Sequence, residues 1–139
     1  MLEDDIAEIL VTEEEIKARV AELGRAISAN YEGKDPLLVA VLKGAVVFLT
    51  DLMQHITIPH EMDFIAVSSY GAATETSGIV RLVMDLETNI EGRHVLLVED
   101  IVDTGLTLNY IVENLKTRQP ASLKTCVLLN KPARRRINV

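Results

Sequence analysis

Cysteine, tryptophan and long apolar runs are scarce or absent in this chain. The one cysteine, Cys126, excludes an internal disulfide and fits a reducing compartment, and its apolar neighbours predict a buried, unreactive thiol. No segment has the roughly 18 uninterrupted apolar residues of a membrane span, and the acidic start "MLEDDIAEIL" is unlike a signal peptide. We therefore expect a cytoplasmic protein without a membrane partner.

Positive charge is also in short supply. Fourteen lysines and arginines against 21 acidic residues give a formal net charge of −7, which argues against nucleic acid as a partner because such a surface needs a basic field. The G-x-x-x-x-G-K-[ST] and G-x-G-x-x-G patterns are both missing, so neither a nucleoside triphosphatase loop nor a dinucleotide-binding loop is indicated. Any phosphate site must therefore be local.

The apolar residues, 48% of the 139, are arranged in short runs that predict a single domain over residues 1–139. A capping-box spacing from Thr12 to Glu15 predicts a helix that ends near Asn30. Further helices are predicted at 45–56 and near 106–115, strands at 36–42, 62–70, 79–85, 94–99 and 123–129, and core positions at Met53, Met62 and Met84. The alternation predicts an α/β fold with a mostly parallel sheet flanked by helices, in which ligands bind beyond the carboxyl ends of the strands.

The stretch "VLLVEDIVDTGLTL" combines an apolar strand, carboxylates and a turn of small residues. A helix that begins near Leu106 would present backbone amides to a phosphate, and Gly105 permits close approach of the backbone. The acids just before the turn suit sugar hydroxyls or Mg²⁺. The stretch thus favours a sugar phosphate, against the alternative that Asp103 or Thr104 only caps the helix and the other acids are solvated.

The same stretch resembles the phosphoribosyl-pyrophosphate motif of the type I phosphoribosyltransferases, in the form of the hypoxanthine-guanine branch. Three other segments are similar to that branch: "VAVLKGAVVFLTDL" to its pyrophosphate loop, "DFIAVSSYG" to the start of its catalytic loop, and "LLNKPARR" to its purine-contacting segment. The similarity runs from about residue 8 to the end, in the family's order. It implies the Rossmann-like type I fold and Mg²⁺-dependent transfer of 5-phosphoribosyl from phosphoribosyl pyrophosphate to hypoxanthine or guanine, by a homo-oligomer (dimer or tetramer).

The resemblance also implies a role for individual positions around the ribose phosphate. Glu99 and Asp100 would contact the ribose hydroxyls and the metal, and Asp103 would lie near the purine N7 as general acid or base. The cradle of the 5′-phosphate would consist of Asp103, Thr104, Gly105, Leu106 and Thr107.

The remaining implied roles concern pyrophosphate, the reacting centre and the base. Lys43 and Gly44 would form the pyrophosphate loop, where the family commonly has a non-proline cis peptide before the lysine, and Arg135 would lie near the pyrophosphate. Ser69 and Tyr70 would belong to the loop that closes over the reacting centre, and Lys131 would donate to the exocyclic oxygen of a 6-oxopurine. From the residues alone, Lys43 also fits a solvated lysine, the segment 68–78 a flexible hairpin connection, and "KPARRR" an exposed charged tail.

The chain departs from the family at its C-terminal end. Family members continue with a strand and a hood that stack an aromatic side chain on the purine, whereas this C-terminally short chain stops at Val139 and contains no tryptophan. The sequence therefore supplies only part of the purine pocket expected from the resemblance. This leaves open a non-catalytic module of the same fold that binds nucleotides or phosphoribosyl pyrophosphate, and a scaffold that binds neither.

Overall fold

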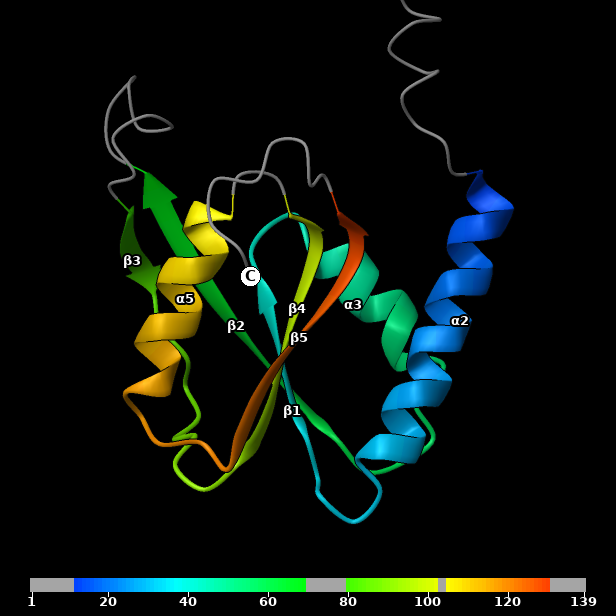
Figure 1. The fold of residues 1–139 in the computed structure, drawn as a ribbon, viewed down its shortest axis with the longest axis horizontal. Helices are drawn as coiled ribbons and strands as arrows, with labels where there is room; N and C mark the ends of the chain where they lie inside the picture. Colours follow the sequence, from blue (N-terminus) through cyan, green and yellow to red (C-terminus); the bar gives the residue numbers. More distant parts are fainter. Residues whose placement is uncertain (1–11, 70–79, 103–104, 131–139) are drawn as a thin grey trace, which may run out of the picture.

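The structure is a computed structural model that describes residues 12–69, 80–102 and 105–130. Its centre is a five-stranded sheet with the order β3-β2-β1-β4-β5 (Figure 1). The strands are β1 (Leu37–Val41), β2 (Glu61–Ser69), β3 (Val80–Met84), β4 (His94–Val102) and β5 (Ser122–Asn130). Strand β1 pairs in parallel with β2 and β4, β4 pairs in parallel with β5, and β3 is antiparallel to β2. The prediction of a mostly parallel α/β sheet is confirmed.

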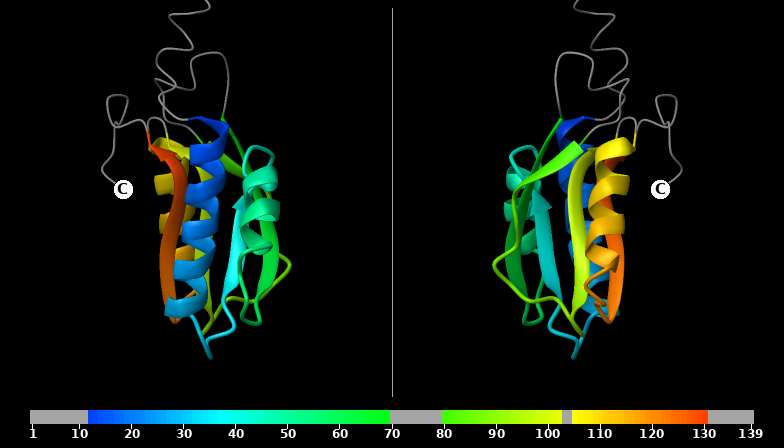
Figure 2. Two further views of the ribbon diagram at one scale, coloured as in Figure 1. Left: turned by 90° about the vertical axis from the view of Figure 1, so that its right-hand side faces the viewer. Right: turned by 90° about the vertical axis from the view of Figure 1, so that its left-hand side faces the viewer.

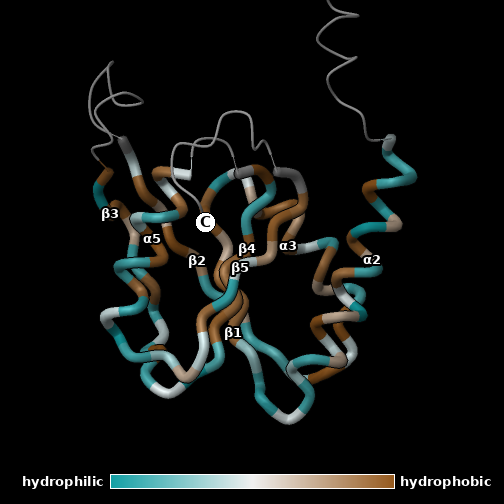
Figure 3. Tube along the Cα trace, viewed as in Figure 1, coloured by the Kyte–Doolittle hydropathy of each residue, from teal (hydrophilic) through white to brown (hydrophobic). Residues whose placement is uncertain are grey.

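Helices cover both faces of the sheet, as the two turned views in Figure 2 show. Helices α2 (Glu13–Asn30) and α3 (Val46–Met53) pack on one face, and α5 (Leu106–Lys116) packs on the other. All five residues of β1 are buried; Leu38 and Ala40 face α2 and α3, whereas Leu37 and Val39 face α5. Hydrophobic residues are accordingly concentrated along the central strands (Figure 3).

The start of α2 follows the predicted capping box. The backbone N–H of Glu15 donates to the Thr12 hydroxyl at 3.1 Å, and the backbone N–H of Thr12 donates to the Glu15 carboxylate at 3.4 Å. These two bonds satisfy amides that the first turn of a helix leaves without partners. The helix extends to Asn30, as predicted.

Two predicted boundaries are wrong. Helix α3 ends at Met53 rather than at residue 56, because the amides of the next three residues bond to carbonyls three positions back and form a tighter turn. Strand β4 continues to Val102 rather than ending at Glu99, because β5 pairs beside it as far as Val102 with Asn130. Glu99 and Asp100 therefore lie inside the last part of the strand.

The predicted burial of sulphur-containing residues is confirmed in part. Cys126 is buried, and burial raises the pKa of its thiol to about 11 even though Arg19 lowers it, so it stays a thiol near neutral pH. Met53 packs against the core. Met62 and Met84 are wrong predictions, since they are 52% and 40% exposed near the β3 edge of the sheet.

Candidate active site

The two central strands β1 and β4 end at the same edge of the sheet. They run parallel and in register, from Leu37 beside Val95 to Ala40 beside Val98. The turn after β1 contains a cis peptide bond between Leu42 and Lys43, as the resemblance implied. Lys43 is exposed, and α3 begins three residues later. The Lys43–Gly44 turn and the end of β4 are therefore neighbours in space.

Gly44 lies directly against the side chain of Asp100. A Cβ atom built on Gly44 would stand 3.3 and 3.4 Å from the two carboxylate oxygens of Asp100. Contacts this close leave little room for a side chain at residue 44. Two segments that are 56 positions apart in the sequence thus form one surface at the strand ends.

The carboxyl groups of Glu99 and Asp100 interact with each other and with the backbone of β4. The amide of Asp100 donates to Glu99 Oε1 at 3.0 Å, and the amide of Ile101 donates to Asp100 Oδ1 at 2.9 Å. The pKa of Glu99 is raised to about 8, mainly by burial and then by the neighbouring Asp100 carboxyl, whose effect exceeds the lowering caused by the Asp100 amide. A cation or hydroxyl donors placed here would favour the charged form of Glu99.

The helix α5 begins at Leu106, as the sequence predicted. Its N-cap is Gly105, which is buried and has no side chain to cap the helix. The φ angle of Gly105 is +88°, a left-handed conformation that glycine adopts without strain. The amide of Asn109 bonds to the Gly105 carbonyl at 2.9 Å, which fixes the first turn. Leu108, Ile111 and Leu115 hold the helix on the sheet. Its positive end therefore lies beside the end of β4, where an anion is stabilised.

The structure places about half of the predicted site residues together. Within the described residues, the edge of the sheet combines Lys43, Gly44, Glu99, Asp100, Gly105, Leu106 and Thr107. Ser69 is the last residue of β2. The predictions for Tyr70, Asp103, Thr104, Lys131 and Arg135 lie outside the described residues. Their roles therefore stay predictions.

The sequence interpretation missed one buried charged residue, Asp63, which lies in β2 and binds backbone amides of the segment after β3. No local pattern marks it, because two of its three partners are 24 and 25 residues away. Its place between Met62 and Phe64, in the apolar middle of the strand, was the only available signal.

Comparison with known proteins decides the family. The profile of the family described as "Phosphoribosyl transferase domain" matches residues 7–137. The chain belongs to this family. A hypoxanthine-guanine phosphoribosyltransferase of Mycobacterium avium is 52% identical over 141 residues, which cover 97% of this chain and 70% of the relative. This phosphoribosyl transferase domain is thus similar in sequence to the hypoxanthine-guanine branch.

Solved structures agree with this placement. A Staphylococcus aureus hypoxanthine phosphoribosyltransferase superposes with a TM-score of 0.88 at 42% identity, over 94% of this chain and 71% of that one. The Trypanosoma cruzi enzyme in complex with its product IMP superposes with a TM-score of 0.84 at 47% identity, over 94% and 74%. The type I phosphoribosyltransferase fold is confirmed, and the chain spans about two thirds to three quarters of the length of these relatives.

Proposed function

We propose that this chain transfers the 5-phosphoribosyl group from phosphoribosyl pyrophosphate to hypoxanthine or guanine, forming IMP or GMP and pyrophosphate. The observation that carries the proposal is the meeting of three elements at one edge of the sheet: the Lys43–Gly44 turn, the Glu99–Asp100 pair and the N-terminus of α5. Each suits a different part of the same substrate, namely its pyrophosphate, its ribose and its 5′-phosphate.

The first turn of α5 supplies the part of the site that holds the 5′-phosphate. Backbone amides and the helix dipole bind a phosphate monoester without a lysine, and Gly105 lets the backbone approach it closely. Thr107, in the same turn, adds a hydroxyl donor. The carboxylates of Glu99 and Asp100 accept hydrogen bonds from the ribose hydroxyls. Neither carboxylate would bind the phosphate itself favourably, because both groups are negatively charged acceptors.

The donor set fits a magnesium ion that arrives with the substrate. Carboxylate oxygens are the ligands that Mg²⁺ prefers, and the Glu99–Asp100 pair offers them at a point where burial already disfavours the uncompensated charge of Glu99. Within the described residues, no three acidic, histidine or cysteine side chains converge on one point. Proteins commonly bind Mg²⁺ through one or two carboxylates together with the phosphates of the substrate, and the Glu99–Asp100 pair would suit such shared binding. When bound, Mg²⁺ would neutralise negative charge on the leaving pyrophosphate.

The transfer breaks the bond between ribose C1′ and the pyrophosphate oxygen and forms a bond from C1′ to a purine nitrogen. Lys43 and the backbone at Gly44 would hold the departing pyrophosphate, with Arg135 nearby. Asp103 would accept or return the purine proton, and Lys131 would donate to the exocyclic oxygen of the base. Ser69 and Tyr70 would shield the cationic sugar from water.

Self-association and a cytoplasmic location complete the proposal. Val83 and Met84 of the edge strand β3 are exposed apolar side chains that a second subunit would cover. In the Trypanosoma cruzi enzyme, the C-terminal region has a role in oligomeric state and enzymatic activity. Within the described residues, no helix has the length and apolar character needed to cross a membrane.

A direct assay tests the function. Wild-type chain is incubated with phosphoribosyl pyrophosphate, Mg²⁺ and one base at a time: hypoxanthine, guanine, xanthine or adenine. We expect nucleotide from hypoxanthine and guanine, and a loss of about 100-fold in kcat/KM for Lys43→Met, because the removed charge faces the leaving group. Lys124→Met, at an exposed lysine of β5, is the matched control.

Two results would change the proposal. A preference for adenine would remove the role given to Lys131. Tight binding of GMP with no turnover on any base would favour the non-catalytic binding module instead.

A further inference from the structure

Strand β2 changes its partner half-way along its length. Residues 61–65 pair with β1, whereas residues 66–69 pair with β3, and a register shift separates Ala66 from Val67. The amide of Leu42 donates to the Ile65 carbonyl at 2.9 Å, which marks the level at which β1 ends. Residues 66–69 and 80–84 therefore form a two-stranded arm that projects past β1 (Figure 1). At about 3.3 Å per residue, Ser69 lies roughly 13 Å beyond Ile65.

This arm starts beside the candidate active site. Its base is level with Leu42, the residue before Lys43, and β3 has a neighbouring strand on one side only. A two-stranded ribbon is marginally stable by itself. Val67 and Leu82 contact the core on the α5 side, but the direction in which the arm projects depends on how its base is held.

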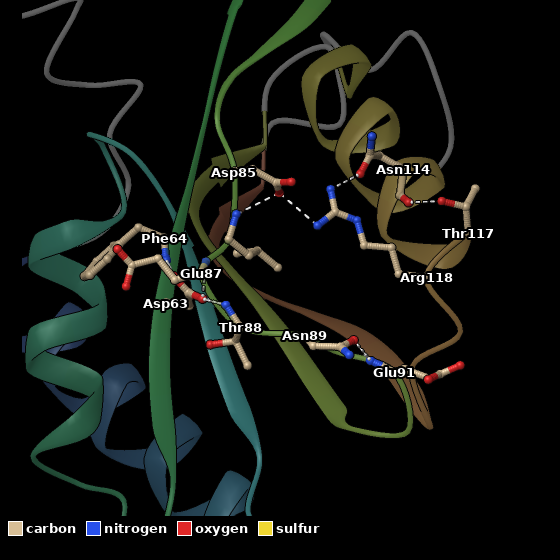
Figure 4. Close-up of polar contacts among 11 residues, drawn as sticks. Asp63, Phe64, Asp85, Glu87, Thr88, Asn89, Glu91, Asn114, Thr117 and Arg118 are labelled. Carbon is tan, nitrogen blue, oxygen red and sulfur yellow. Dashed lines mark hydrogen bonds and ion pairs between the residues drawn. The ribbon is translucent and has the colours of Figure 1, made fainter.

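Asp63 holds that base. Among the described residues it is the most fully buried charged side chain, with 7% of its surface exposed, whereas Glu99 is only half-buried. Its carboxylate accepts from the amide of Phe64 at 2.7 Å and from the amides of Glu87 and Thr88 at 3.0 and 2.9 Å (Figure 4). The two longer-range bonds tie the chain that leaves β3 to the lower half of β2, where β2 is already fixed by β1.

A second contact connects the arm to α5. Arg118 forms an ion pair with Asp85 at 2.8 Å and donates to Asn114 Oδ1 at 2.7 Å (Figure 4). Asp85 directly follows the last residue of β3, and Asn114 lies in the last turn of α5. The base of the arm is thus joined both to the sheet and to the helix whose other end is the proposed phosphate site.

We propose that Asp63 is a positioning residue for phosphoribosyl transfer, whose carboxylate fixes the base of the β2–β3 arm and so keeps the Ser69 end of β2 in place beside the reacting centre. This inference rests on the proposed function. Asp63 acts through the arm and touches no substrate. It follows that the loss of Asp63 impairs the transfer step while the phosphate site at α5 remains intact.

The test compares Asp63→Asn with the wild-type chain at a temperature where both are folded. Asparagine keeps the shape of the side chain but has one acceptor oxygen in place of two, so it cannot accept from the amide of Phe64 on one side and from the amides of Glu87 and Thr88 on the other at the same time. We expect kcat to fall at least tenfold, the Kd for GMP to stay within twofold, and the amides of residues 80–88 to exchange with solvent at least tenfold faster. Thr88→Val removes only the hydroxyl that also bonds to Asp63, and should give a smaller change in the same three readouts.

The control is Ile27→Ala, which removes a buried side chain of α2 on the opposite face of the sheet. It should lower the melting temperature without slowing kcat or loosening residues 80–88. Unchanged kcat in Asp63→Asn despite faster exchange would overturn the inference. Parallel losses of kcat and GMP affinity in Asp63→Asn and Ile27→Ala would overturn it as well. Absence of transfer by the wild-type chain would contradict the proposed function, whereas the exchange rates decide independently whether Asp63 fixes the arm.

Discussion

Replacement of Glu99 by glutamine should change how the stability of the protein depends on pH. In the folded state the pKa of Glu99 is raised to about 8 from an ordinary 4.5, mainly by burial and then by the Asp100 carboxyl. The folded state therefore binds this proton more tightly than the unfolded state. The resulting stabilisation is complete below the unfolded pKa and is lost as the pH rises through the folded pKa.

The size of this effect follows from the interval between the two pKa values. Each pKa unit corresponds to about 1.4 kcal/mol, so the whole interval is worth up to about 5 kcal/mol, and the part between pH 5 and pH 8 about 3 kcal/mol. Glutamine does not titrate. We therefore expect Glu99→Gln to gain about 3 kcal/mol relative to wild type when the pH is raised from 5 to 8.

Denaturant unfolding at a series of pH values in Mg²⁺-free buffer measures this difference. Glu32→Gln, at an exposed glutamate, is the control and should leave the pH dependence of wild type unchanged. A constant difference between Glu99→Gln and wild type across the series would refute the reasoning, because it would mean that the Glu99 carboxyl is neither desolvated nor close to that of Asp100.

Three further predictions concern single residues. Gly44→Ala should lower kcat/KM for phosphoribosyl pyrophosphate about tenfold, since the new Cβ would crowd the Asp100 carboxylate and shift the turn; an unchanged value in steady-state kinetics would contradict the contact. Cys126, whose pKa burial raises to about 11, should resist alkylation near pH 8 until the protein is unfolded, as mass spectrometry can show; rapid labelling of the native state would argue against its burial. Burial alone would raise the pKa of Asp63, but its hydrogen bonds from Phe64, Thr88 and Glu87 outweigh this and hold the pKa below its usual value. Wild type should therefore lose this contribution to stability as the pH falls below about 4, and acid unfolding of Asp63→Asn should lack that loss.

Local patterns predicted the parts of the fold that depend on local physics. The capping box at Thr12 and the spacing of apolar residues in α5 are properties of a few consecutive turns, and both helices begin where the sequence indicated. β1 is buried on both faces, so its continuous apolar run was also sufficient. The resemblance added the cis peptide before Lys43, which no propensity would have indicated.

The wrong or missing predictions depend on contacts between distant segments. The end of β4 is set by pairing with β5, and the end of α3 lies where the turn at His55 packs against Gly24 of α2. Met62 and Met84 are exposed because they lie near the edge of the sheet. That position becomes known only once the order of the strands is known. The contact between Gly44 and Asp100, and the bonds of Asp63 to Glu87 and Thr88, likewise require the three-dimensional structure.

A crystal structure of the chain with GMP tests the central claim most directly. We expect the phosphate to lie at the first turn of α5, within hydrogen-bond distance of backbone amides at residues 105–107, and the ribose hydroxyls to face Glu99 and Asp100. GMP bound elsewhere, or a first turn of α5 closed by other groups with no space for a phosphate, would contradict it.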